Sequence, residues 1–105
     1  MGILINPYRF GRFTFPTNGL IAYYPFSGNA NDLSGNGYNG IVNGATLVTD
    51  RFGNANSAYY FDGSNDQITL PNGVRQTGKF SISFWVNVES WTHANYPSLF
   101  GGYGL

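Results

Sequence analysis

The sequence has no cysteine, and charged side chains are scarce among its 105 residues. Without cysteine there is no disulfide framework and no thiol chemistry. Charged residues form 10% of the chain, against about 25% in an average soluble domain, and the five basic and five acidic side chains cancel. A nucleic-acid-binding protein needs a clustered basic surface to neutralise phosphates, so we expect no nucleic-acid partner.

Long apolar runs and paired catalytic groups are missing as well. No stretch approaches the roughly 18 apolar residues of a membrane-spanning helix, so we expect no membrane span. Glycoside hydrolysis usually requires a pair of carboxylates, whereas Glu89, the single glutamate, has no acidic residue two positions away. His93, the single histidine, has no residue near it in sequence that would orient it as a base. We therefore expect a protein without enzymatic activity.

Aromatic residues, by contrast, make up 18% of the chain, and glycine occurs 15 times. They form short apolar segments separated by turns, without a helical period. The clearest expected strand is 79–89, where alternate positions are apolar: Phe80, Ile82, Phe84, Val86 and Val88. Further strands are expected at 20–26, at two places within 40–48, at 57–63 and 66–70 as a hairpin around 63–65, and at 96–104. The pattern predicts an all-β, antiparallel fold.

Residues 1–18 differ in character from the rest of the chain. They are rich in large apolar side chains, and Pro7 and Pro16 bias their neighbours toward extended backbone. We expect an extended N-terminal docking arm that ends in a turn at Pro16–Gly19. The arm either lies across the domain's own sheet or inserts into a neighbouring subunit, and the sequence leaves both alternatives open.

Four segments follow the arm in a fixed order. They read YYPF at 23–26, NDLSGNGYNG at 31–40, GNANSAYYFDG at 53–63 and SFWV at 83–86. In this order and spacing, the chain from Gly19 to about Gly102 resembles the laminin-G-like group of concanavalin A-like jelly rolls. The resemblance implies an antiparallel β-sandwich, a structural calcium ion in many members, and binding of glycans or proteins without catalysis.

A jelly roll needs about eight strands, and fewer are visible here. We therefore expect residues 19–105 to form the N-terminal portion of the domain, an incomplete sandwich. Either the chain is a partial product, or another chain covers the open edges of the sheet. The segment INPYRFG at 5–11 also resembles the N-termini of structural proteins of tailed bacteriophages. Together these features suggest an oligomeric virion component (a tail or capsid-decorating protein) that contacts other structural subunits through residues 1–18.

The loop at 31–40 has the spacing of a cation site. Asp32, Ser34 and Asn36 occupy alternate positions before a glycine, as in the first half of a calcium-binding loop, and the Tyr38 carbonyl would be the next ligand. The closing glutamate of such a loop is replaced by Asn43, so only weak binding is expected. The competing interpretation is that these side chains only form turn hydrogen bonds.

A second acidic pair, Asp62 and Asp66, brackets a turn. The two carboxylates either share a cation or proton, or simply cap the turn, and we favour capping.

Exposed aromatic residues are the candidates for ligand contact. Trp91 and Tyr96 lie in a polar segment and are the residues that we expect to stack on a sugar. Phe84 and Trp85 point to opposite faces of one strand, so at least one is expected in the core, and we expect Trp85 to pack on the sheet. The alternative function is thus a free-standing, calcium-assisted lectin module of an extracellular protein that binds cell-surface glycans.

Overall fold

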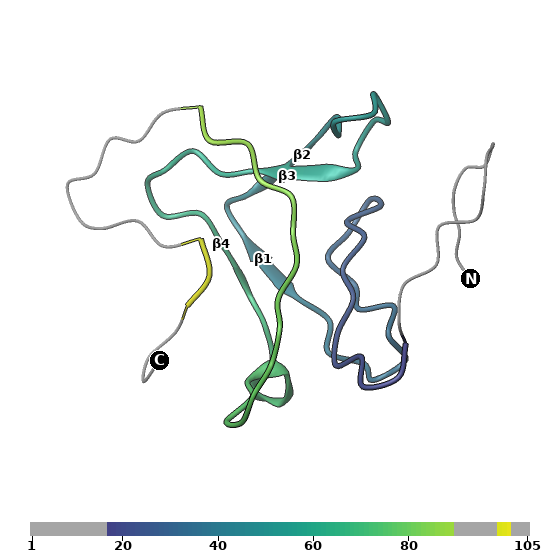
Figure 1. Cartoon of the computed structure of the whole chain (residues 1–105). Helices are drawn as coiled ribbons and strands as arrows, with labels where there is room; N and C mark the ends of the chain where they lie inside the picture. The colour runs from purple at the N-terminus through teal and green to yellow at the C-terminus, as the bar shows by residue number, and fades with distance from the viewer. Residues whose placement is uncertain (1–16, 90–98, 102–105) are drawn as a thin grey trace. The chain divides into compact units, whose positions relative to one another are not determined.

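The structure is a computed structural model that describes residues 17–89 and 99–101, which belong to two units divided between Arg75 and Gln76. In the first unit, four short strands form two small antiparallel sheets (Figure 1). The elements are β1 (Ile41–Asn43), β2 (Thr46–Val48), β3 (Ala58–Tyr60), β4 (Gln67–Thr69) and a single 3₁₀ turn, η1 (Asn72–Val74). The all-β prediction is confirmed for these described residues, which contain no α-helix.

The two sheets are the two parts of one interrupted hairpin. β1 pairs with β4, so that Val42 lies opposite Ile68, and β2 pairs with β3, so that Leu47 lies opposite Tyr59. The inner pair is nested within the outer pair along the chain, and Figure 1 shows each pair side by side. The chain therefore reverses its direction in the segment that joins β2 to β3.

This topology contradicts the expected hairpin around residues 63–65. β3 and β4 follow one another on the same side of the hairpin and do not pair with each other. Residues 61–66 between them bulge out opposite residues 44–45. Side chains close the bulge: Ser64 N–H donates to Asp62 Oδ1 (2.8 Å), and Asp62 N–H donates to Asp66 Oδ2 (2.9 Å). Both carboxylates thus cap the turn, as the sequence favoured.

Gly44 makes room for this bulge. Its φ is +84°, and a Cβ at this position would overlap the carboxylate of Asp66. Asn–Gly at 43–44 therefore does not close a two-residue hairpin. Its glycine instead lies opposite the bulged residues on the other side of the hairpin, where a side chain would not fit. The two expected strands within 40–48 exist, but both pair with more distant segments.

Two other expected strands are absent from the described residues. Segment 20–26 is irregular because Pro25 has no N–H and Phe26 has a φ of +57°, which breaks an extended backbone. The Phe26 ring is held edge-on to Tyr59, with centroids 5.2 Å apart. Segment 79–89 pairs with no other described segment, so its alternation is not part of a β-ladder. The expected turn before residue 20 is present, since Leu20 N–H donates to Thr17 O (3.1 Å).

The described residues bury almost no apolar side chain. Ala30 and Ala45 are the buried apolar residues, and no large side chain is fully buried. Phe84 and Trp85 are 53% and 79% exposed, so neither lies in a core within its own unit, whereas one of them was expected to do so. The segments that should build a core instead leave their apolar faces accessible.

Candidate functional site

The calcium-like loop of the sequence is a compact element that leads into β1. Gly40 N–H donates to Ala30 O (2.8 Å), and Asp32 N–H donates to the side-chain oxygen of Asn39 (3.0 Å), so that the loop closes on itself. The side chain of Asp32 lies inside, and the residue is only 8% exposed. A carboxylate in this position must find hydrogen-bond donors or a cation.

Four donors converge on the Asp32 carboxylate. Its Oδ1 accepts hydrogen bonds from Tyr23 N–H (2.9 Å) and Ser34 N–H (2.8 Å). Its Oδ2 accepts hydrogen bonds from Tyr38 N–H (3.0 Å) and the Ser34 hydroxyl (2.8 Å). Since an ionised carboxylate has about four acceptor sites, the backbone and Ser34 satisfy all of them.

The hydrogen bonds favour the charged form of Asp32. Burial alone raises the pKa of this carboxyl, but the donors from Tyr23, Ser34 and Tyr38 outweigh burial and hold the pKa below its ordinary value. The same negative charge affects Tyr24, whose pKa is raised, first by burial and then by the neighbouring Asp32 carboxylate. Asp32 is thus a stabilised buried anion.

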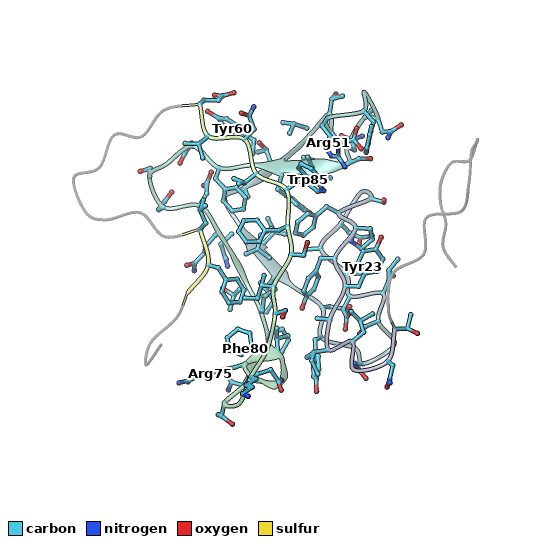
Figure 2. The ribbon with its side chains drawn as sticks, viewed as in Figure 1. Tyr23, Arg51, Tyr60, Arg75, Phe80 and Trp85 are labelled. Carbon is cyan, nitrogen blue, oxygen red and sulfur yellow. The ribbon has the colours of Figure 1, made fainter. Side chains whose placement is uncertain are left out.

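The loop is also connected by hydrogen bonds to the preceding segment, 20–26, on which Figure 2 labels Tyr23. The side-chain amide of Asn36 donates to Ile21 O (2.8 Å), and the Tyr24 hydroxyl donates to Tyr38 O (2.6 Å). Leu33 N–H adds a backbone hydrogen bond to Tyr23 O (2.8 Å). These contacts join the expected loop to segment 20–26, which was expected to be a strand but is irregular.

The structure brings together all four residues expected to ligate calcium, Asp32, Ser34, Asn36 and Tyr38, but in the role of hydrogen-bond partners. Ser34 donates its hydroxyl to Asp32, Asn36 holds Ile21 O through its amide, and the Tyr38 carbonyl accepts the Tyr24 hydroxyl. A cation would have to displace these donors, so the arrangement as it stands does not fit calcium. No group of three or more His, Cys, Asp or Glu residues able to hold a metal occurs within residues 17–89 and 99–101. Calcium binding stays a prediction from the spacing of the loop residues and from the resemblance.

In a second loop, 49–57, an aspartate carboxylate again accepts hydrogen bonds from nearby residues of the loop. Asp50 Oδ1 accepts hydrogen bonds from Phe52 N–H (2.8 Å) and Asn54 N–H (2.9 Å), and Oδ2 accepts one from the Asn54 amide (3.0 Å). Burial raises the pKa of Asp50, but these bonds and one from Gly53 N–H outweigh it, so the pKa is lowered. This loop forms the reversal between β2 and β3.

A shared sequence signal marks both loops, which the calcium interpretation missed. Residues 32–36 read DLSGN and residues 50–54 read DRFGN, so both have the pattern Asp-x-x-Gly-Asn. In each, the aspartate accepts the N–H two residues later, which is the hydrogen bond of an Asx turn. No sequence pattern marked Asn39, whose side-chain oxygen accepts the N–H of Asp32.

The residues proposed for sugar stacking, Trp91 and Tyr96, lie outside the described residues, as does most of the docking arm 1–18. Comparisons with protein-family models, curated proteins and solved structures found no match to the chain. Among the described residues, no helix has the length and apolar character needed to cross a membrane. The site is therefore interpreted from its own geometry.

Proposed function

We propose that this chain is a non-catalytic structural and adhesion module, built on a laminin-G-like jelly-roll plan, that works as part of a larger protein assembly. The observation that carries the proposal is the imbalance between buried and accessible apolar side chains. In the described residues only Ala30 and Ala45 are buried apolar residues, while large side chains such as Phe52, Phe80 and Phe84 are exposed.

The energetic consequence supports an assembly. Burying one large apolar side chain contributes about 1.5–3 kcal/mol, and strands of three residues are too short to be stable by themselves. Accessible apolar faces on soluble proteins usually mark interaction surfaces. A further protein surface over these side chains would supply the burial that the described residues lack.

The carboxylates support a structural role in place of catalysis. Asp32, Asp50, Asp62 and Asp66 each accept backbone N–H groups, and each thereby fixes a turn. A general acid or base needs a proton-transfer position open to substrate, whereas the oxygens of Asp32 are fully used by donors. These residues maintain shape.

The type of assembly is proposed from the sequence resemblance alone. INPYRFG at 5–11 resembles phage structural proteins, so we propose a virion as the location and other structural subunits as partners of the arm 1–18. Size-exclusion chromatography with light scattering tests this on the full chain and on a chain without residues 1–18. We expect the full chain to be oligomeric or to bind apolar dye, and arm deletion to reduce assembly. A dye-silent, stable monomer would refute the proposal.

Glycan binding is the second candidate, favoured by one observation. Trp85 is 79% exposed, and an indole ring is suited to packing against the C–H groups of a sugar ring. A glycan array with the native chain and with Trp85→Ala tests this role. Binding lost in the variant would support it, and absence of binding to every glycan would eliminate it.

A further inference from the structure

Segment 79–89 presents an apolar face that has no strand partner within the described residues of its own unit. The segment belongs to the second unit, and its even positions, Phe80 to Val88, are between 44% and 54% exposed. Within the described residues of that unit, 76–89 and 99–101, no strand pairs with its backbone. Figure 1 shows the segment as a continuous trace without an arrow, and Figure 2 labels Phe80 and Trp85 on it. An uncovered segment of this kind is a template for another strand.

The order of residues in the segment is nearly symmetric about Phe84. It reads KFSISFWVNVE, with Lys79 at one end and Glu89 at the other. If two copies align antiparallel with Phe84 opposite Phe84, every even position meets an even position. Phe80 then lies opposite Val88 and Ile82 opposite Val86, so one face of the pair is wholly apolar.

The charges select this register. In the aligned pair, Lys79 of each copy lies opposite Glu89 of the other copy, which gives two complementary pairs related by a twofold axis. Shifting the register by two residues keeps the apolar face together but separates both charge pairs. A parallel, in-register pairing would place Lys79 opposite Lys79 and Glu89 opposite Glu89, which is unfavourable.

We propose that residues 79–89 bind the same segment of a second copy of this chain as an antiparallel strand pair centred on Phe84. This interface deepens the proposed function, on which it rests, by naming a surface and a partner for the assembly. Because both copies use the same surface, the contact is closed by its own symmetry. The two apolar faces then form one continuous face, which a further protein surface of the proposed assembly would cover.

A charge-swap experiment tests the register. Lys79 and Glu89 are exposed, so Lys79→Glu and Glu89→Lys are not expected to disturb folding. Each single variant places like charges opposite each other twice per dimer, and we expect self-association to weaken about tenfold at low ionic strength. Mixing the two single variants, or combining both changes in one chain, restores opposite charges and should restore association.

A cross-linking experiment tests which residues of the two copies lie opposite each other. The chain has no cysteine, so a single Phe84→Cys residue meets its own copy at the axis and should form an interchain disulfide on mild oxidation. Ser83→Cys is the matched control, since position 83 lies opposite position 85 and should cross-link much less.

Several outcomes would overturn the interface. Equal association of the single, mixed and double variants would show that the charges do not set the register. A monomer in which hydrogen exchange protects residues 79–89 would show that the chain itself covers them. An assembly that forms but ignores the charge swaps would remove this interface and leave the proposed function standing, whereas a dye-silent monomer would remove both.

Discussion

Replacing Asp32 by asparagine changes one oxygen of the most enclosed polar group among the described residues. The amide oxygen of the variant can still accept hydrogen bonds from Tyr23 N–H and Ser34 N–H. The new NH₂ group, however, faces the Tyr38 N–H that previously donated to Oδ2 at 3.0 Å. The Ser34 hydroxyl can rotate toward Ile21 O, 3.2 Å away, but a backbone N–H has no such freedom.

The expected loss follows from this inventory. One charge-assisted hydrogen bond disappears and one buried donor is left facing another donor, so we expect the free energy of unfolding to fall by about 2–3 kcal/mol. For a domain of this size, that corresponds to a melting temperature lower by about 10–20 °C. Urea unfolding followed by circular dichroism, in EDTA to remove any bound cation, measures the difference.

Asp62→Asn is the matched control. Asp62 is exposed, and the amide oxygen of asparagine can keep the hydrogen bond from Ser64 N–H. We expect a change within about 0.5 kcal/mol for this variant. If Asp32→Asn were as mild as Asp62→Asn, the four donors would not be stabilising the loop, and the interpretation of Asp32 as a buried structural anion would be refuted.

Four further outcomes are expected. Gly44→Ala should lower the free energy of unfolding more than Gly63→Ala. Both glycines have a φ of +84°, but an added Cβ has open space at Gly63 and meets Asp66 at Gly44. Equal losses of the free energy of unfolding in urea would contradict this. Because the pKa of Asp32 is lowered by folding, its contribution is present above about pH 4 and lost as the pH falls through the folded-state pKa, so acid unfolding should be less steep in Asp32→Asn. Phe26→Gly should be more stable than Phe26→Ala by about 1 kcal/mol, since both remove the ring but only glycine tolerates a φ of +57° without strain; the reverse order would show that the backbone relaxes. Adding 1 mM calcium should leave the melting temperature unchanged, whereas a rise seen in the native chain but not in Asp32→Asn would establish the cation site.

The positions of the short strands were predictable from local composition, but their pairing was not. The sequence located strands near β1, β2, β3 and β4 because β-branched and aromatic residues cluster there between turn residues. The pairing of β1 with β4 brings Gly44 next to Asp66, which lies far away in the chain. A turn signal such as residues 63–65 cannot distinguish a hairpin from a bulge on one side of a hairpin.

The candidate site was half predictable for a similar reason. The spacing of Asp32 and Ser34 identified the loop and its central carboxylate, because a side chain bonding the N–H two residues later is a local event. The chemistry of the site depends on Tyr23 N–H and Tyr38 N–H, which reach the carboxylate only after the loop has folded over the preceding segment. Oxygen spacing alone therefore could not distinguish a cation ligand from an acceptor of backbone hydrogen bonds.

The contrast between hydrogen-bonded loops and short apolar strands explains how an assembly module of the proposed kind could keep its shape with little core. Loops built on Asp32 and Asp50 are fixed by hydrogen bonds over short distances in sequence, so their geometry does not require a large apolar interior. The strands and segment 79–89 have the opposite need, because their side chains gain stability only when another surface covers them. A partner that covers the apolar faces thus adds to stability without having to build the loops. In such a chain, the stability of the strands and the formation of the assembly become one thermodynamic quantity that depends on protein concentration.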